Sequence, residues 1–133
     1  GRVVAVKSGT TGALEAQKRL PKAVIRIFEE VAACVLEVSQ GKADAFIYDA
    51  LTVYNNHKNN SNTTRINLES IPGTDGYWGM AIKKGNTELL ARVNSFIKSY
   101  QEEGGFSALA NTYLNEEKQI FDEAGIPFFF DIK

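Results

Sequence analysis

The amino-acid sequence predicts an α/β protein in which a mostly parallel sheet is flanked by helices and followed by C-terminal helices. Short apolar runs of strand length alternate with segments of helical periodicity over the first half of the chain. After Gly85, apolar residues follow the helical period alone, until a short apolar run ends the chain. Alternation of this kind is typical of parallel strands joined by right-handed helical crossovers.

The first half of the chain contains three strand-helix pairs. The predicted elements are strands 2–6, 23–28 and 43–50, and helices 11–20, 29–41 and 50–57. The first helix stops before Pro21, because the residue preceding a proline disfavours the helical conformation. The second has acidic residues in its first turn and Gly41 just past its end, as the helix dipole and a left-handed cap favour.

The second half changes in character. Two more strands are expected at 64–71 and 76–84, separated by the turn-forming residues PGTDG. Two amphipathic helices then follow, at 86–105 and 106–125. Their apolar stripes indicate that each covers, or is covered by, another surface.

Composition excludes several classes of function. The 15 basic and 16 acidic residues give a net charge of −1, so neither nucleic acid nor an anionic membrane is an expected partner. The single cysteine, Cys34, excludes an internal disulfide and a cysteine-based zinc cluster. His57 stands alone in a polar stretch, so no metal and no cofactor are predicted.

The chain opens directly on a strand, with no charged and apolar leader before it. No run of residues has the length and apolarity of a membrane span. We therefore expect either a cytoplasmic protein or a mature piece of a longer one, and favour the piece.

The turn after the first strand predicts an anion site. KSGTTG passes directly into a helix, whose first amides are unpaired and carry partial positive charge. Gly9 and Gly12 let the backbone approach a ligand, while Thr10 and Thr11 offer hydroxyls. The Gly-Lys-Ser/Thr ending of a Walker phosphate loop is absent, and so is the dinucleotide-binding pattern G-x-G-x-x-G. A small carboxylate is therefore favoured over a phosphate group as the bound anion. The alternative is a tight turn with a threonine cap.

The end of the third strand supplies a complementary charge. Asp49 follows an apolar run, and parallel strands deliver their carboxyl ends to one edge. A carboxylate there can pair with an ammonium group, although it can equally cap the following helix. Together the two features predict a site for the zwitterion of a free amino acid. The Lys7 backbone carbonyl and Tyr77 are further candidate ligand contacts.

Three segments, VAVKSGTTG, GKADAFIYD and GYWGMAIKKGNTELLARVNSFIKSYQEEGGFSALANTYL, carry a family resemblance. Their order and spacing resemble family 3 of the bacterial extracellular solute-binding proteins, which serve polar amino-acid ABC transporters. The resemblance covers roughly residues 3–115. It implies that Thr11, supported by Thr10 and Gly12, binds the ligand α-carboxylate and that Asp49 binds the α-ammonium. It also implies that Asp44 has a structural role.

The same resemblance implies a type II periplasmic-binding-protein lobe, cut from a protein of two lobes. Residues 1–83 would be the second lobe with its return hinge strand, and 84–133 the helices that pack on the absent first lobe. The expected partners are an amino acid and an ABC permease. The expected location is periplasmic or extracellular, with a lipid anchor on the parent protein. Uncovered C-terminal helices predict a homodimer.

Two other functions remain open at this stage. One is a ligand-binding sensory domain of a receptor or channel, and the other is a dehydratase on the same fold. Against an enzyme, no histidine or carboxylate pair is placed for acid-base work near Thr11 and Asp49. The identity of the bound amino acid is not predicted, because most side-chain contacts would come from the other lobe.

Overall fold

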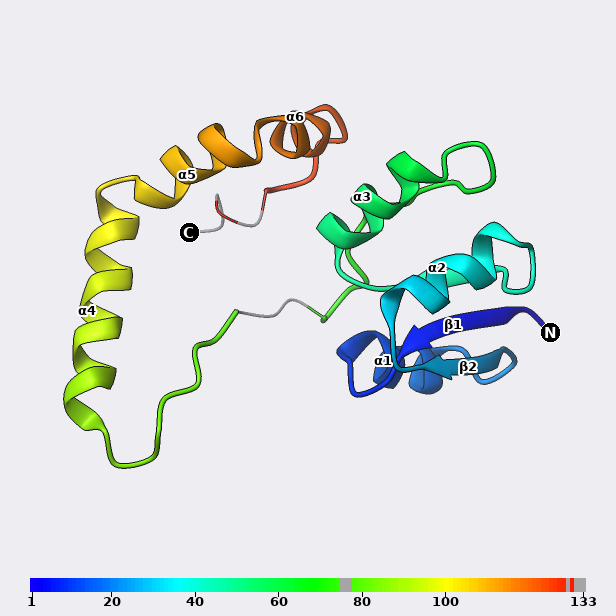
Figure 1. The fold of residues 1–133 in the computed structure, drawn as a ribbon, viewed down its shortest axis with the longest axis horizontal. Helices are drawn as coiled ribbons and strands as arrows, with labels where there is room; N and C mark the ends of the chain where they lie inside the picture. The colour runs from blue at the N-terminus through cyan, green and yellow to red at the C-terminus, as the bar shows by residue number, and fades with distance from the viewer. Residues whose placement is uncertain (75–77, 129, 131–133) are drawn as a thin grey trace. The chain divides into compact units, whose positions relative to one another are not determined.

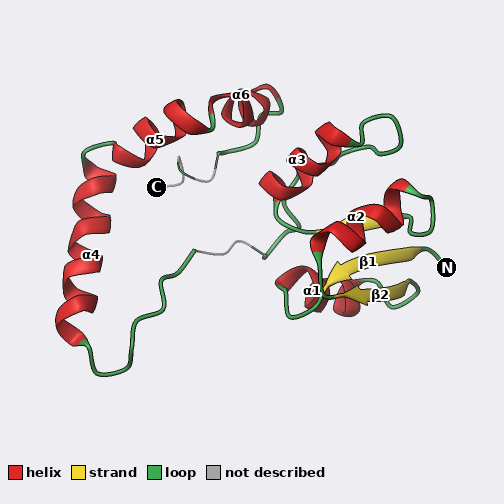
Figure 2. Ribbon diagram, viewed as in Figure 1, coloured by secondary structure: helices red, strands yellow, loops and turns green. Residues whose placement is uncertain are grey.

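The computed structural model describes residues 1–74, 78–128 and 130. The chain divides into two compact units, Gly1–Glu69 and Ser70–Lys133, which we call the first and the second unit. Figure 2 shows strands in the first unit and helices in both. The predicted division into a lobe over 1–83 and a helical segment over 84–133 remains a prediction.

The first unit is built on a three-stranded parallel sheet, of which Figure 1 labels the strands β1 and β2. Its strands are β1 (Val3–Lys7), β2 (Val24–Phe28) and β3 (Ala45–Ile47), in the order β2-β1-β3. The α/β fold class with a parallel sheet is therefore confirmed. Because β1 is central, the chain that leaves β1 lies between the ends of β2 and β3.

Helices cover both faces of this sheet. Helix α1 (Thr11–Arg19) packs on one face and α2 (Val31–Ser39) on the other, while α3 (Ala50–Asn59) follows β3. Successive β1 side chains point to opposite faces, so the strand contributes to two apolar clusters. The buried residues are Val4, Val6, Ala13 and Ala16 on the α1 side, and Ala5, Cys34 and Ala43 on the α2 side.

The second helix starts later than its sequence suggests. Glu29 and Glu30 were predicted in its first turn, but α2 begins at Val31 and Glu30 is its N-cap. The two carboxylates therefore stand at the carboxyl end of β2. The predicted end is confirmed: Gly41 follows the helix with φ of 70°, a left-handed conformation that glycine adopts without strain.

The second unit contains α4 (Thr87–Glu102), α5 (Gly105–Tyr113) and α6 (Asn115–Glu123). The sequence predicted one helix over 106–125, which is wrong. Leu114 leaves the helical conformation, with φ of −132° and ψ of 29°. Its amide donates to Ala110 at 2.8 Å, and its carbonyl accepts from Lys118 at 2.8 Å, so one residue ends α5 and starts α6.

The two strands predicted at 64–71 and 76–84 are not found among the described residues of those segments. A strand exists only where a neighbour completes its ladder of hydrogen bonds. Neither segment has such a neighbour in the part of the chain that is described, so apolar pattern alone does not produce a strand. No helix in that part is long and apolar enough to cross a membrane.

Candidate functional site at the carboxyl edge of the sheet

The turn between β1 and α1 is fixed by its own backbone. The Ser8 amide donates to the Phe28 carbonyl at 2.7 Å, which extends the pairing of β1 and β2 by one residue. Gly9 then adopts φ of 69°, where a side chain would be strained. The chain thus reverses directly into the first turn of α1.

Thr10 holds this turn as the helix N-cap. Its hydroxyl donates to the Lys7 carbonyl at 2.8 Å and accepts from the Ala13 amide at 3.3 Å. The cap that the sequence left open as an alternative is therefore present. It is made by Thr10, and it leaves the neighbouring Thr11 hydroxyl to other partners.

Thr11 and Gly12 are the first two residues of α1. Their amides have no acceptor among the described residues, as expected for the first positions of a helix. The Thr11 side chain is exposed. Two amides and a hydroxyl beside the positive end of the helix dipole are suited to a carboxylate.

Gly12 brings α1 into close contact with β3. A Cβ atom placed on Gly12 would lie 2.8 Å from the Ile47 carbonyl oxygen and 3.4 Å from its carbonyl carbon. The first turn of α1 therefore rests on the end of the neighbouring strand. No sequence signal could have named Ile47 as a partner, because its contribution is a backbone atom.

Asp49 stands at the same edge, two residues after β3. Val6 of β1 pairs with Ile47 of β3, so the two strands end side by side. The Asp49 carboxylate is exposed, and its Oδ1 accepts from the Thr52 amide at 2.9 Å as the N-cap of α3. Its Oδ2 has no donor among the described residues, and a carboxylate oxygen can accept from an ammonium.

The other two predicted contacts have different outcomes. The Lys7 carbonyl already accepts the Thr10 hydroxyl, which leaves one lone pair for a ligand. The Lys7 side chain has a separate effect on Cys34. Burial raises the pKa of the Cys34 thiol, while the residue's own backbone hydrogen bond and the Lys7 charge lower this pKa. Tyr77 lies outside the described residues.

At the opposite edge of the sheet, where the strands begin, an ion pair connects β1 and β3. Arg2 contacts Asp44 at 2.6 Å, and the Val3 amide donates to Asp44 at 2.8 Å. The Val3 amide and the Arg2 guanidinium hold the pKa of the Asp44 carboxyl below its usual value. Asp44 thus joins the starts of β1 and β3, a structural role that agrees with the one the family resemblance implied.

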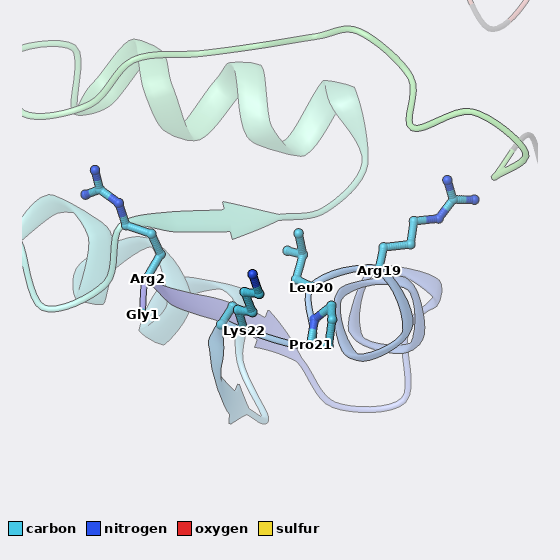
Figure 3. Close-up of a pocket in the computed structure, with 7 residues that line it drawn as sticks. Gly1, Arg2, Arg19, Leu20, Pro21 and Lys22 are labelled. Carbon is cyan, nitrogen blue, oxygen red and sulfur yellow. The ribbon is translucent and has the colours of Figure 1, made fainter.

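An open pocket of about 550 Å³ also lies at this opposite edge. It is lined by the residues that precede β1 and β2, and Figure 3 shows Leu20, Pro21 and Lys22 between the side chains of Arg2 and Arg19. Both arginines pair with carboxylates, Arg2 with Asp44 and Arg19 with Glu15. The pocket is therefore separate from the candidate site and adds no residue to it.

Comparisons with known proteins cover most of the chain. No family model matches it. The ABC transporter glutamine-binding protein GlnH of Bacillus subtilis (strain 168) is 28% identical over 116 residues, which are 87% of this chain and 41% of that protein. The chain spans 41% to 43% of the curated relatives it matches.

Two solved structures share the fold. The ancestral amino acid-binding protein AncCDT-1, described as a precursor of cyclohexadienyl dehydratase, matches with a TM-score of 0.67 and 34% identity over 84% of this chain and 46% of that one. A mutant of ArgBP from T. maritima matches with a TM-score of 0.69 and 25% identity over 86% and 48%. Over most of its length the chain resembles the bacterial solute-binding proteins of family 3, of which it spans less than half. It has the fold of one lobe of a type II periplasmic binding protein, with C-terminal helices.

Proposed function

We propose that the chain is the amino-acid-binding component of an ABC uptake transporter, and that one half of its ligand site is the carboxyl edge of the first unit. The α-carboxylate binds the Thr11 and Gly12 amides with the Thr11 hydroxyl, and the α-ammonium binds Asp49. The observation that supports this proposal is the contact of Gly12 with Ile47. In this contact the first turn of α1 lies against the strand that leads to Asp49.

The remaining predicted residues assist these contacts. Thr10 holds the turn, and the Lys7 carbonyl supplies a second acceptor for the ammonium. Tyr77 stays a predicted ligand contact. None of these groups performs covalent chemistry, so the ligand is bound and released unchanged.

The proposal excludes catalysis by this part of the chain. The single histidine, His57, bonds through its ring to the Thr64 hydroxyl at 2.8 Å. It stands eight positions after Asp49, about 12 Å along the axis of α3 at 1.5 Å per residue. AncCDT-1 is described as the precursor of a dehydratase, but here no proton-transfer pair faces the candidate site among the described residues.

The charge of the edge favours a cationic ligand side chain. Glu29 and Glu30 are exposed at the end of β2 and form no ion pair among the described residues, whereas Glu15, Glu37 and Asp44 each pair with an arginine. AncCDT-1 is also described as an ancestral cationic amino acid solute binding protein. Arginine and lysine are therefore the first ligands to test.

The rest of the proposal concerns the whole protein. Since the chain spans less than half of its relatives, we place a second lobe over the carboxyl edge, supplying the ligand's side-chain contacts. The closed protein would deliver its ligand to a membrane permease from the periplasm or the extracellular face. A lipid anchor on the parent protein completes this arrangement.

We also propose that the chain self-associates through its C-terminal helices. Helix α4 has no buried residue, and its exposed apolar side chains include Leu89, Leu90 and Phe96. Light scattering tests this proposal with Phe96→Glu and, as a matched control, Ser95→Glu on the same helix. We expect dimers for the wild type and the control and monomers for Phe96→Glu. A monodisperse wild-type monomer would contradict it.

Nuclear magnetic resonance of the labelled chain tests the binding proposal. Because a single lobe binds more weakly than two, the twenty amino acids are titrated to millimolar concentrations while the Thr11 and Gly12 amides are followed. We expect saturable shifts with a few polar amino acids, led by arginine or lysine, and their loss in Asp49→Ala. Nα-acetyl-L-arginine lacks the ammonium and should bind at least about tenfold more weakly. No saturable shift at either amide with any amino acid would overturn the proposal.

A further inference from the structure

We propose that Gly12 sets the distance between the carboxylate-binding amides and Asp49, and so restricts the site to α-amino acids. This inference rests on the proposed function and deepens it. Gly12 is then a positioning residue as well as part of the carboxylate site, because the closeness of α1 to β3 depends on its missing side chain.

The reason for a glycine at this position is space. Gly12 is not among the glycines with positive φ, so its backbone conformation is open to any residue. It is the second residue of α1, and within helices alanine is intrinsically more favourable than glycine. A Cβ atom, however, would meet the Ile47 carbonyl oxygen at 2.8 Å, closer than Cβ atoms approach a non-bonded backbone atom in folded proteins. Any side chain therefore moves helix or strand by roughly half an ångström or more.

This one contact joins the two halves of the proposed site. The Gly12 amide is one of the two donors for the carboxylate, and Ile47 leads after one residue to Asp49. Neighbouring anchors restrict movement elsewhere: Thr10 is bonded to Lys7 and Ala13. Displacement at Gly12 therefore changes mainly the distance from the amides to Asp49.

Ligand geometry gives that distance a chemical meaning. In an α-amino acid the ammonium nitrogen and the carboxylate carbon are about 2.5 Å apart, from standard bond lengths and angles. A β-amino acid inserts one more carbon and extends this distance by about 1.3 Å when its chain is extended. Binding sites need their groups placed within about 0.5 Å, so a contact that brings α1 against β3 selects the shorter ligand.

The test compares L-arginine with L-β-homoarginine, and L-glutamine with L-β-homoglutamine, on the wild type, Gly12→Ala and Leu14→Ala. Binding is followed by magnetic resonance, and folding by circular dichroism. Leu14 is 68% exposed on the same helix and serves as the control for a changed α1. We expect the wild type and Leu14→Ala to bind the α-form at least about tenfold more tightly than its β-homologue.

In Gly12→Ala we expect the affinity for the α-amino acid to fall by about tenfold. The affinity for its β-homologue should fall by less than about threefold. An equal loss of affinity for the α-amino acid and for its β-homologue would show that Gly12 supports only the fold, and would overturn the inference. If Gly12→Ala does not fold, the wild type decides, since equal wild-type affinity for the two forms also overturns it. A wild type that binds no amino acid contradicts the proposed function itself, and the inference fails with it.

Discussion

The two units of the chain bury their apolar residues to very different degrees. In the first unit, β1 alone contributes Val4, Ala5 and Val6 to apolar clusters on both faces of a sheet. Among the described residues of the second unit only Ala110, Phe121 and Phe128 are buried hydrophobics, while Trp78, Phe96 and Tyr113 are exposed. The first unit therefore has a core of its own. The second has amphipathic helices whose apolar side chains are largely exposed among its described residues.

Separating the units gives the largest expected effect. A chain of residues 1–69 should unfold cooperatively, with a free energy of unfolding on the order of 5 kcal/mol. A chain of residues 70–133 should melt gradually, because its helices bury little apolar surface. Circular dichroism during thermal unfolding measures both. A sharp transition in the second chain would remove the contrast.

Truncating one side chain in each unit gives a smaller effect. Val6→Ala should lower the free energy of unfolding by about 2 kcal/mol, because Val6 is 0% exposed between the sheet and α1. Tyr113→Ala removes a much larger group, yet should cost less than about 0.5 kcal/mol, because Tyr113 is 75% exposed. Urea titration of the whole chain measures both. Equal losses would show that the second unit is packed as tightly as the first.

Acid should destabilise the first unit slightly through Asp44. The folded pKa of this carboxyl lies below its usual 3.8, held down by the Val3 amide and by Arg2. Its stabilising effect is therefore complete above that usual value and is lost as the pH falls through the folded pKa. Urea midpoints between pH 6 and pH 2.5 should fall less in Asp44→Asn than in the wild type. Glu69→Gln, another exposed carboxylate of the first unit, should follow the wild type.

The sequence predicted the elements up to Asn59 better than those that follow it. Strand runs such as 23–28 and helix signals such as Gly41 act locally, and the observed β2 and α2 lie within the predicted ranges. The predicted strands at 64–71 and 76–84 required a hydrogen-bonding neighbour, which a local pattern does not contain. The break at Leu114 did leave a signal that was overlooked: Glu116 and Glu117 are the acidic first turn of a new helix.

For the candidate site, the sequence identified side chains but not how they are held together. Thr10, Thr11 and Asp49 were named from motifs at strand ends, and the sheet order places those ends side by side. The contact of Gly12 with the Ile47 carbonyl was not predictable, because it depends on how closely a helix rests on a neighbouring strand. Glu29 and Glu30 were assigned to a helix when they belong to the site edge, because helix starts are imprecise by a residue or two.

The most direct test of the account asks whether Asp49 binds a ligand or only caps α3. Asparagine caps a helix about as well as aspartate, so Asp49→Asn keeps the hydrogen bond to Thr52 and removes only the charge. Thermal unfolding and the titration of L-arginine and L-glutamine are measured on the wild type, Asp49→Asn and Asp49→Ala. We predict wild-type stability for Asp49→Asn with affinity reduced at least about tenfold, and a further loss of about 1 kcal/mol of stability in Asp49→Ala. Wild-type affinity in Asp49→Asn would show that Asp49 is a helix cap alone, and would contradict the central claim.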